Sequence, residues 1–374
     1  MALTLSHWSS LYVLRALRAD GIDLRAADSI GFLPPSPWKG KNWNAHNFDP
    51  EYWRWLRPAA GAPLHVLIPN RSGRLRAKHI VTHSVWCTLP PGSILWVDEH
   101  TRMVAPELLF VQMAEEMPLP ALVMLGYELC GHFYRFANNP LGATEDAEIP
   151  TATSVDRLTE YLSTLSGMHG VSKAQEALQY VNDHAISVPE AVLATMYSLP
   201  VHEAGYGMGP VVLNERVDVD GSGAKSNRYP DLSFSFAPLG LNYDGEGHLD
   251  LGSVAEAAKR YALADSSSKM AAHEELRRTL ADVRAKVVDD NERNRQLASR
   301  GRIVFPVTKE NLYGWGNLDN LTRQILECAR AVFGVDTREH LLTLDNTDQT
   351  RDRYALLTSL LSSGGAREAP RGKN

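Results

Sequence analysis

Cysteine is scarce in this chain of 374 residues. Cys87, Cys130 and Cys328 are scattered, and no two of them have the C-x-x-C spacing. This pattern argues against a disulfide framework or a zinc ribbon and is typical of a protein from a reducing cytoplasm. The chain also lacks a signal-peptide pattern and an apolar run long enough to span a membrane. We therefore expect a cytoplasmic protein without a membrane partner.

An excess of positive charge is also missing, because the formal net charge is -6. Residues 1–140 hold 13 Lys and Arg against 11 Asp and Glu, whereas the remaining residues hold 25 against 33. The second half is therefore the acidic half. This balance argues against indiscriminate binding of nucleic acid, although local basic patches can still hold a phosphate backbone.

The most informative segment is an acidic hairpin in the second half. Residues 229–236 alternate in polarity, which places their apolar side chains on one face of a strand and Asp231 on the other. A turn leads to a second strand with Asn242 and Asp244 on its polar face. If the strands pair, Asp231 comes within cross-strand or diagonal reach of Asp244.

Two carboxylates at one edge of a sheet suit a hard cation such as Mg²⁺, which prefers oxygen ligands. Such a cation can activate a water molecule and neutralise charge that develops on a phosphate. The alternative is a surface hairpin whose polar face meets solvent. The spacing alone favours neither interpretation.

A resemblance favours the first interpretation. Three short motifs follow one another along the chain: Pro230-Asp231, then Asn242-x-Asp244-Gly245-x-x-His248, then Asp290-x-x-Arg293. They resemble the short-patch-repair (Vsr-like) endonuclease group, and more closely an uncharacterised branch often fused to antitoxin-like domains. The pattern of that group reads PD, then E-x-D-G-x-x-H, then D-x-x-R. The chain departs from it at Asn242, where the group carries glutamate.

The resemblance implies a role for each matching residue. The implied catalytic set is Glu190, Asp231, Asn242, Asp244, His248, Asp290 and Arg293, with Glu190, Asp231 and Asp244 as ligands of Mg²⁺. His248 would position or protonate a leaving group, and Arg293 would steady phosphate charge or pair with Asp290. Glu190 has an alternative role as a first-turn acid that complements a helix dipole. An amide at position 242 brings no charge, so it weakens the metal site.

The elements around the hairpin fit the restriction-endonuclease core that the resemblance implies. The patterns predict a helix from about Ser187, a strand at 211–214, the hairpin, a helix with Asp290 and Arg293 on one face, a strand at 303–308 and a closing helix at 318–332. Residues 249–288 are an insertion with a largely helical pattern. This insertion is either a lid or DNA-contacting arm, or a solvated helical spacer.

The N-terminal half begins with a predicted helix at 3–18. Predicted strands at 64–69 and 80–86 flank a basic run that holds Arg71, Arg74, Arg76 and Lys78. This run either contacts nucleic-acid phosphates or forms a solvated hairpin tip. His79 and His83 share a strand face but lie far apart along it, so we do not expect a metal site from this pair without further ligands.

Two further helices, at 106–114 and 120–130, follow these strands. The whole block over roughly residues 1–135 resembles the antitoxin-like domain of AbiEi-type abortive-infection modules. The resemblance implies DNA-binding regulation and defence against phage. No convincing helix-turn-helix precedes the block.

Together the resemblances imply a mixed α+β or α/β architecture, with an N-terminal antitoxin-like α+β domain and a C-terminal restriction-endonuclease-like mixed sheet flanked by helices. The predicted parts are an antitoxin-like domain at 1–137, a linker with short helices at 138–185, an endonuclease-fold domain at 186–335 and a C-terminal tail at 336–374.

Two functions follow. The first is a Mg²⁺-dependent DNA endonuclease of a phage-defence or toxin–antitoxin system, acting with a partner protein of that system. The second is a catalytically inactive nuclease-fold protein that binds DNA or protein as an antitoxin-like regulator, which Asn242 supports directly.

Overall fold

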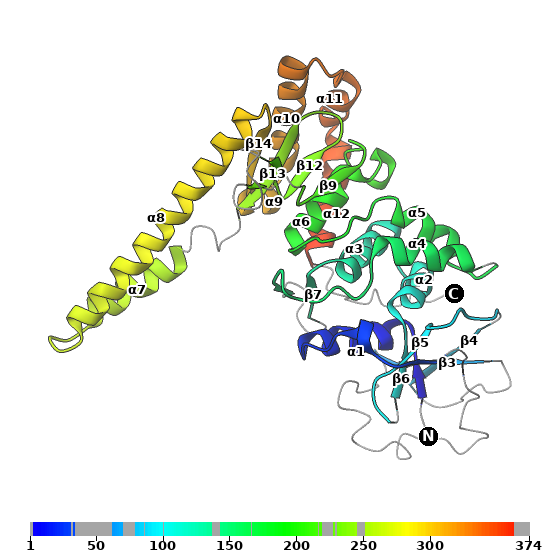
Figure 1. Ribbon diagram of the computed structural model, residues 1–374. Coiled ribbons are helices and arrows are strands. Elements are labelled where there is room, and N and C mark those ends of the chain that lie inside the picture. Colours follow the sequence, from blue (N-terminus) through cyan, green and yellow to red (C-terminus); the bar gives the residue numbers. More distant parts are fainter. Residues whose placement is uncertain are drawn as a thin grey trace. The chain divides into compact units, whose positions relative to one another are not determined.

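A computed structural model describes most of the chain (Figure 1). The described residues are 3–30, 33, 62–69, 79–85, 87–99, 101–136, 143–165, 167–215, 217–218, 227–228, 230–244 and 251–362. At a few of them, including Asp244 and Asp290, only the backbone is described. The chain divides into a first unit, Met1–Thr195 with Ser359–Asn374, and a second unit, Met196–Thr358. Each unit mixes helices and sheet, which confirms the expected α+β class.

The described part of the first unit contains a six-stranded mixed sheet of order β2-β5-β6-β1-β3-β4. Its strands are β1 (Leu3–Leu5), β2 (Ser29–Ile30), β3 (Leu64–Ile68), β4 (Ile80–Ser84), β5 (Ile94–Trp96) and β6 (Thr101–Val104). The predicted first helix begins later than expected, because residues 3–5 pair in parallel with β6 before α1 (His7–Ala19) starts. Local periodicity does not reveal this long-range pairing.

The interpretation of residues 71–78 as a hairpin tip is wrong. Strands β3 and β4 pair in parallel, with His65 opposite Val81 and Leu67 opposite His83. A parallel pair needs a connection that returns to the opposite end of the sheet, whereas a hairpin joins antiparallel strands. The basic residues Arg71, Arg74, Arg76 and Lys78 lie outside the described residues.

Helices complete the first unit. The predicted helix pair is present as α2 (Pro106–Glu116) and α3 (Leu119–Cys130), followed by the short hairpin of β7 (Phe133–Arg135) and β8 (Ala143–Glu145), α4 (Val155–Thr164) and α5 (Val171–Leu178). Helices α4 and α5 confirm the short helices predicted at 138–185. They are no linker, because they pack against α2 and α3 and bury Leu158 and Ala174 completely. Arg15 of α1 forms a bidentate pair with buried Glu128 of α3, at 2.7 Å for both bonds.

The second unit is built around a four-stranded sheet of order β14-β13-β12-β9. Its strands are β9 (Val211–Leu213), β12 (Leu232–Phe234), β13 (Leu239–Asp244) and β14 (Ile303–Thr308). Between β9 and β12 in sequence, β10 (Val217–Asp218) and β11 (Asn227–Arg228) form a separate two-stranded sheet. Strand β12 is antiparallel to both β9 and β13, and β14 joins β13 in parallel. The hairpin and both flanking strands therefore lie where the sequence predicts them.

Helices cover both faces of this sheet. On the apolar face, Tyr197 at the end of α6 (Val188–Ser198) meets Phe234 edge-on, and its hydroxyl lies 3.2 Å from Thr322 Oγ1 of α10 (Asn317–Phe333). On the polar face lies the end of α8 (Lys269–Ser299), where Leu297 is fully buried. The short helix α9 (Lys309–Tyr313) follows β14.

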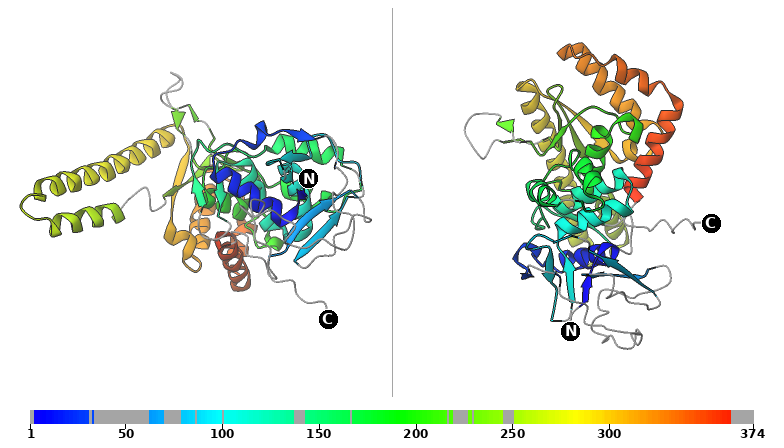
Figure 2. Two further views of the ribbon diagram at one scale, coloured as in Figure 1. Left: turned by 90° about the horizontal axis from the view of Figure 1, so that it is seen from below. Right: turned by 90° about the vertical axis from the view of Figure 1, so that its right-hand side faces the viewer.

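The described part of the insertion, residues 251–288, forms a helical hairpin. Helix α7 (Leu251–Leu263) folds back along the first half of α8, as Figures 1 and 2 show. Arg260 and Glu275 join the two helices at 3.1 Å. Exposed hydrophobic side chains such as Met270 and Leu280 show that this hairpin buries little of its own surface.

The segment at 336–362 is not an irregular tail. It forms α11 (Arg338–Leu344) and α12 (Thr347–Ser362). Arg353 of α12 donates to both carboxylate oxygens of Asp319 in α10, at 2.8 and 2.7 Å. Tyr206 and Thr350 donate to the same carboxylate. The buried side chains of α12 include Leu357, Leu360 and Leu361 as well as Arg353, so the segment carries both an apolar stripe and a buried ion pair.

Candidate functional site

Asp231 and Asn242 face each other across β12 and β13. Leu232 lies opposite Leu241 in this antiparallel pair, so the preceding residue and the following residue form the next pair. The Asp231 backbone N–H donates to Asn242 Oδ1 at 3.2 Å. The predicted alternation of the hairpin is therefore confirmed, and the residue directly opposite Asp231 is the amide.

Asn242 is only 2 % exposed, and its amide is used in both directions. While Oδ1 accepts from the strand opposite, Nδ2 donates to Asn294 Oδ1 of α8 at 3.3 Å. A carboxylate at this position has no N–H to donate. The sequence pattern gave no sign of Asn294, because its role arises only when α8 covers the polar face of the sheet.

The Asp231 carboxylate is half-buried and is held by the same hairpin. Its Oδ2 accepts the Tyr243 backbone N–H at 2.6 Å. A carboxylate fixed by a backbone donor is well placed to present its charge toward the polar face. The backbone of Asp244 continues β13 opposite Thr308 of β14, two residues beyond Asn242.

Helix α8 brings the third motif to this face. Residues 290, 293, 294 and 297 share one helical stripe, and within it Asn294 contacts Asn242 and Leu297 is buried. Arg293 is half-buried in the same stripe. The second unit thus contains Asp231, Asn242 and the helical turn from Asp290 to Arg293. His248 lies outside the described residues.

An ion pair adjoins this group on the same strand face and was not predicted. Arg302 donates to both carboxylate oxygens of Glu215, at 2.6 and 2.9 Å, and to Ser233 Oγ at 3.0 Å. Hydrogen bonds from the guanidinium lower the pKa of Glu215. Ser233 follows Asp231 by two residues, so the ion pair shares the polar face of β12.

Glu190 belongs to the first unit and is built into the start of α6. It is buried, and its carboxylate accepts from the Ile186 backbone N–H and from Ser187 Oγ, both at 3.0 Å. The Glu190 N–H in turn donates to Ser187 Oγ at 3.3 Å. This is the capping arrangement that satisfies donors at a helix N-terminus, in line with the alternative role considered for this residue.

A different group of possible metal ligands lies in the first unit. Ring nitrogens of His7, His65 and His83 all lie within 4.8 Å of one another. Burial lowers the pKa of His7 to about 2, with the neighbouring rings as smaller causes, and lowers that of His83 to about 4. Three neutral imidazoles do not suit Mg²⁺, which prefers oxygen ligands. The sequence analysis considered His83 only with His79 and expected no metal site from that pair without further ligands, and in the structure the further ligands beside His83 are His7 and His65.

Comparisons with protein-family models, with curated proteins and with solved structures found no match for this chain. Among the helices in the described ranges, none combines the length and the apolar character that crossing a membrane requires.

Proposed function

We propose that the second unit is a restriction-endonuclease-like module in which a hydrogen-bonded group of Asp231, Asn242 and Asn294, here called the junction, has replaced the acidic site. We further propose that the protein is a cytoplasmic DNA-binding regulator. The observation that carries this proposal is the buried amide of Asn242, which lies directly opposite Asp231 and is bonded on both sides. It occupies the position of the second carboxylate in the motif that the chain resembles.

The junction competes with metal binding. For Asn242 Oδ1 to reach a cation, it must leave the Asp231 N–H, and a buried N–H without a partner costs about 1–3 kcal/mol. The amide also brings no charge to offset the dehydration of Mg²⁺. Both effects favour the inactive, antitoxin-like alternative over an active endonuclease.

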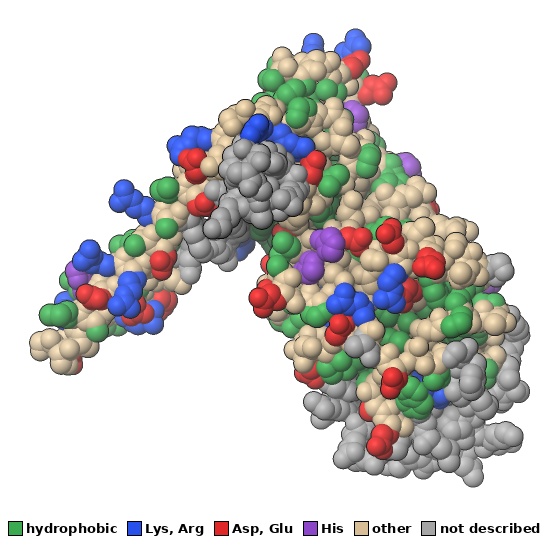
Figure 3. All heavy atoms as spheres, viewed as in Figure 1, with side chains coloured by type: hydrophobic (Ala, Val, Ile, Leu, Met, Phe, Trp, Pro, Cys, Tyr) green, Lys and Arg blue, Asp and Glu red, His purple; other side chains and the backbone are tan. Residues whose placement is uncertain are grey.

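Basic side chains on α7 and α8 supply a surface for a phosphate backbone. Helices α7 and α8 together hold 9 Lys and Arg against 7 Asp and Glu, which reverses the acidic balance of the second half of the chain. Figure 3 shows Lys and Arg side chains along this helical hairpin, interspersed with acids. Arg277, Arg278 and Arg284 are exposed on α8. Phosphate neutralisation by such side chains is the sequence-independent part of DNA binding.

The setting proposed for this regulator is a phage-defence or toxin–antitoxin system with a partner protein. Its support is the resemblance of the N-terminal block to AbiEi-type antitoxin-like domains. The proposal does not need DNA cleavage, because a regulator of this kind only has to bind.

Two series of variants of the full chain test the proposal. In the first, Arg277, Arg278 and Arg284 are changed together to Gln, and Arg330→Gln, Arg338→Gln and Arg351→Gln form a control with the same change of net charge. Affinity for duplex DNA is measured by fluorescence anisotropy over a range of salt concentrations. The α8 variant should bind at least about 10-fold more weakly and show a shallower salt dependence, while the control stays within about 2-fold. Equal losses in both variants would refute a role for α8.

The second series measures nicking of supercoiled plasmid and single-stranded DNA in Mg²⁺ or Mn²⁺. Wild type and Asp231→Ala should both leave the DNA intact, whereas Asn242→Glu restores the missing carboxylate and should create cleavage. If wild type cuts and Asp231→Ala does not, the site is an active nuclease and the regulator proposal fails.

A further inference from the structure

Three histidines from separate parts of the first unit meet beside a pocket. His7 is the first residue of α1, His65 lies in β3, and His83 lies in the neighbouring parallel strand β4. His65 and His83 point to the same face of the sheet. His83 lies opposite Leu67, which is two residues after His65 in the same strand, and residues two apart in a strand share a face. The start of α1 is fixed over them by bonds from Ser6 N to His65 O and from His65 N to Ser9 Oγ.

The imidazoles touch one another directly. His65 Nδ1 lies 2.9 Å from His83 Nε2, and the His7 ring stacks on His83 with 3.6 Å between ring centroids. His7 and His65 are each only 6 % exposed. The buried Nδ1 of His7 has no hydrogen-bond partner among the described residues. Buried polar nitrogens are normally satisfied, so an unsatisfied one needs an explanation.

The backbone at His7 is strained as well. Its φ of 49° lies in the left-handed region, which costs a non-glycine residue free energy and is most often retained at functional sites. The N–H of this residue donates to Gln112 Oε1 of α2 at 3.0 Å, which holds the strained conformation in place. A histidine needed only for packing does not require this arrangement.

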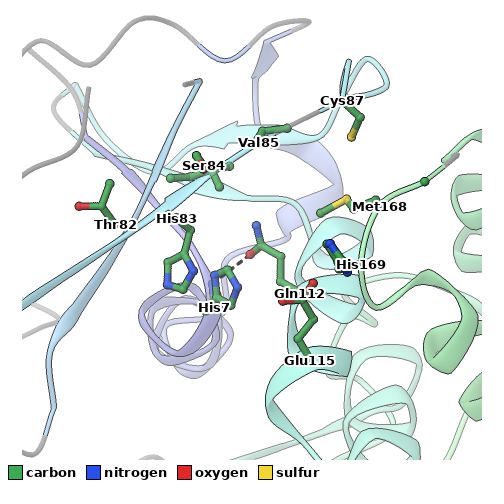
Figure 4. Close-up of a pocket in the computed structure, with 12 residues that line it drawn as sticks. His7, Thr82, His83, Ser84, Val85, Cys87, Gln112, Glu115, Met168 and His169 are labelled. Atoms are coloured by element: carbon green, nitrogen blue, oxygen red, sulfur yellow. Dashed lines mark hydrogen bonds between the residues drawn. The ribbon is translucent and has the colours of Figure 1, made fainter. Parts of the chain in front are cut away.

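A pocket of about 610 Å³ opens next to the cluster. His7 and His83 form one wall, and Gln112, Glu115 and His169 form another. Figure 4 shows the two stacked rings at one side of this space, with the side chains of α2 and of the loop before α5 facing them. Every lining residue belongs to the first unit.

We propose that His7, His65 and His83 bind a divalent transition metal of the zinc type, with a fourth coordination position facing the pocket. Imidazole nitrogens suit zinc and its neighbours and do not suit Mg²⁺ or Ca²⁺. A zinc ion held by three protein ligands keeps its fourth coordination position open for a water molecule or a small anionic ligand. This site is independent of the proposed DNA-binding function.

The metal requires a small rearrangement. Zn–N bonds of about 2.0–2.1 Å in a tetrahedron place ligand nitrogens roughly 3.4 Å apart, and the ring nitrogens of the cluster lie within 4.8 Å of one another. The His7 and His83 rings lie 19° from parallel, so one ring must tilt until both nitrogen lone pairs point at one ion. The His65–His83 hydrogen bond must open, and the neutral imidazole that donates it must adopt its other tautomer, so that its proton sits on the ring nitrogen that does not bind the metal.

Metal uptake by the full-length protein tests the site. Apo protein is titrated with Zn²⁺ against a chromophoric chelator, and the visible absorption of the Co²⁺ form reports coordination geometry. Wild type should bind about one metal ion per chain and give the intense Co²⁺ bands of a tetrahedral site. His83→Ala should lower the affinity for Zn²⁺ at least about 100-fold, because loss of a residue that only hydrogen-bonds to a metal ligand already costs about 10- to 100-fold.

The control and a second variant keep the result interpretable. His169→Ala changes another histidine of the same pocket and should leave the affinity within about 3-fold of wild type. His7→Asn removes the imidazole but keeps a residue that tolerates the left-handed conformation, so the fold is preserved while metal binding falls as in His83→Ala.

X-ray absorption on the metal-loaded wild type then identifies the ligands without any substitution. Three imidazole nitrogens around the ion are expected. Equal uptake by wild type and His83→Ala, loss of the metal in His169→Ala, or a metal–sulfur bond from Cys87 would each overturn the assignment.

Discussion

The substitution Asn242→Asp is the sharpest single perturbation of the proposed junction, because it exchanges one NH₂ group for an oxygen at a site that is 2 % exposed. The bond from the Asp231 N–H to position 242 survives, since a carboxylate accepts it. The bond to Asn294 Oδ1 is lost, and two oxygens then face each other.

The magnitude follows from these contacts. The lost hydrogen bond costs about 1 kcal/mol. Burying a second carboxylate next to the Asp231 carboxylate in metal-free protein adds about 1–3 kcal/mol, so we expect the free energy of unfolding to fall by about 2–4 kcal/mol. An amide flip of Asn294 can restore the lost bond but cannot neutralise the charge.

The assay is urea unfolding of the full-length protein with and without about 10 mM Mg²⁺. A new carboxylate pair should bind the cation, and if the free ion is at ten times its dissociation constant, the variant regains about 1.4 kcal/mol. Wild type should not respond to Mg²⁺. Asn291→Asp is the matched control, since Asn291 is exposed on α8 and its change should stay within about 0.5 kcal/mol. A wild type stabilised by Mg²⁺ as strongly as the variant would refute the reasoning.

Three further outcomes are expected. Glu190→Gln should lower stability by about 1 kcal/mol, because it weakens the start of α6, and DNA binding should persist; unchanged stability would contradict the capping role. Arg353→Met should cost about 3–5 kcal/mol, since it leaves the Asp319 carboxylate buried without its cation. Burial raises the pKa of Asp319, but hydrogen bonds from Arg353, Thr350 and Tyr206 outweigh burial and hold this pKa below its ordinary value of 3.8. The stabilisation of the folded state by the ionised Asp319 is therefore complete above pH 3.8 and is lost as the pH falls through the lowered pKa. The difference in stability between wild type and the double variant Asp319→Asn/Arg353→Met should therefore shrink below pH 3.8, and a constant difference would contradict this.

The sheet of the second unit could be predicted because its signals are local. Alternation fixed the faces of β12 and β13 and predicted Asp231 within cross-strand or diagonal reach of Asp244. The register places Asn242 directly opposite Asp231, so Asp244 takes the diagonal position. The range of β14 was predicted without error, at Ile303–Thr308. The sequence could not predict the hydrogen bonds of Asn242, because its partner Asn294 lies in a helix more than fifty residues further along the chain.

The first unit was harder to predict for a physical reason. A near-continuous apolar run such as β3 is typical of a buried parallel strand, but it identifies neither the partner strand nor the register, so the pairing of β3 with β4 and its consequence for His65 and His83 could not be predicted. The His7 ring joins them only because α1 starts immediately after β1. A cluster assembled from three distant elements has no signature in sequence spacing.

The most direct test of the central claim follows the fate of a labelled DNA duplex incubated with wild-type protein in Mg²⁺. One sample is resolved on a native gel and on a denaturing gel. The account predicts a retarded complex on the native gel and intact strands on the denaturing gel. Cut strands that disappear in Asp231→Ala, or no complex at any protein concentration up to tens of micromolar, would contradict it.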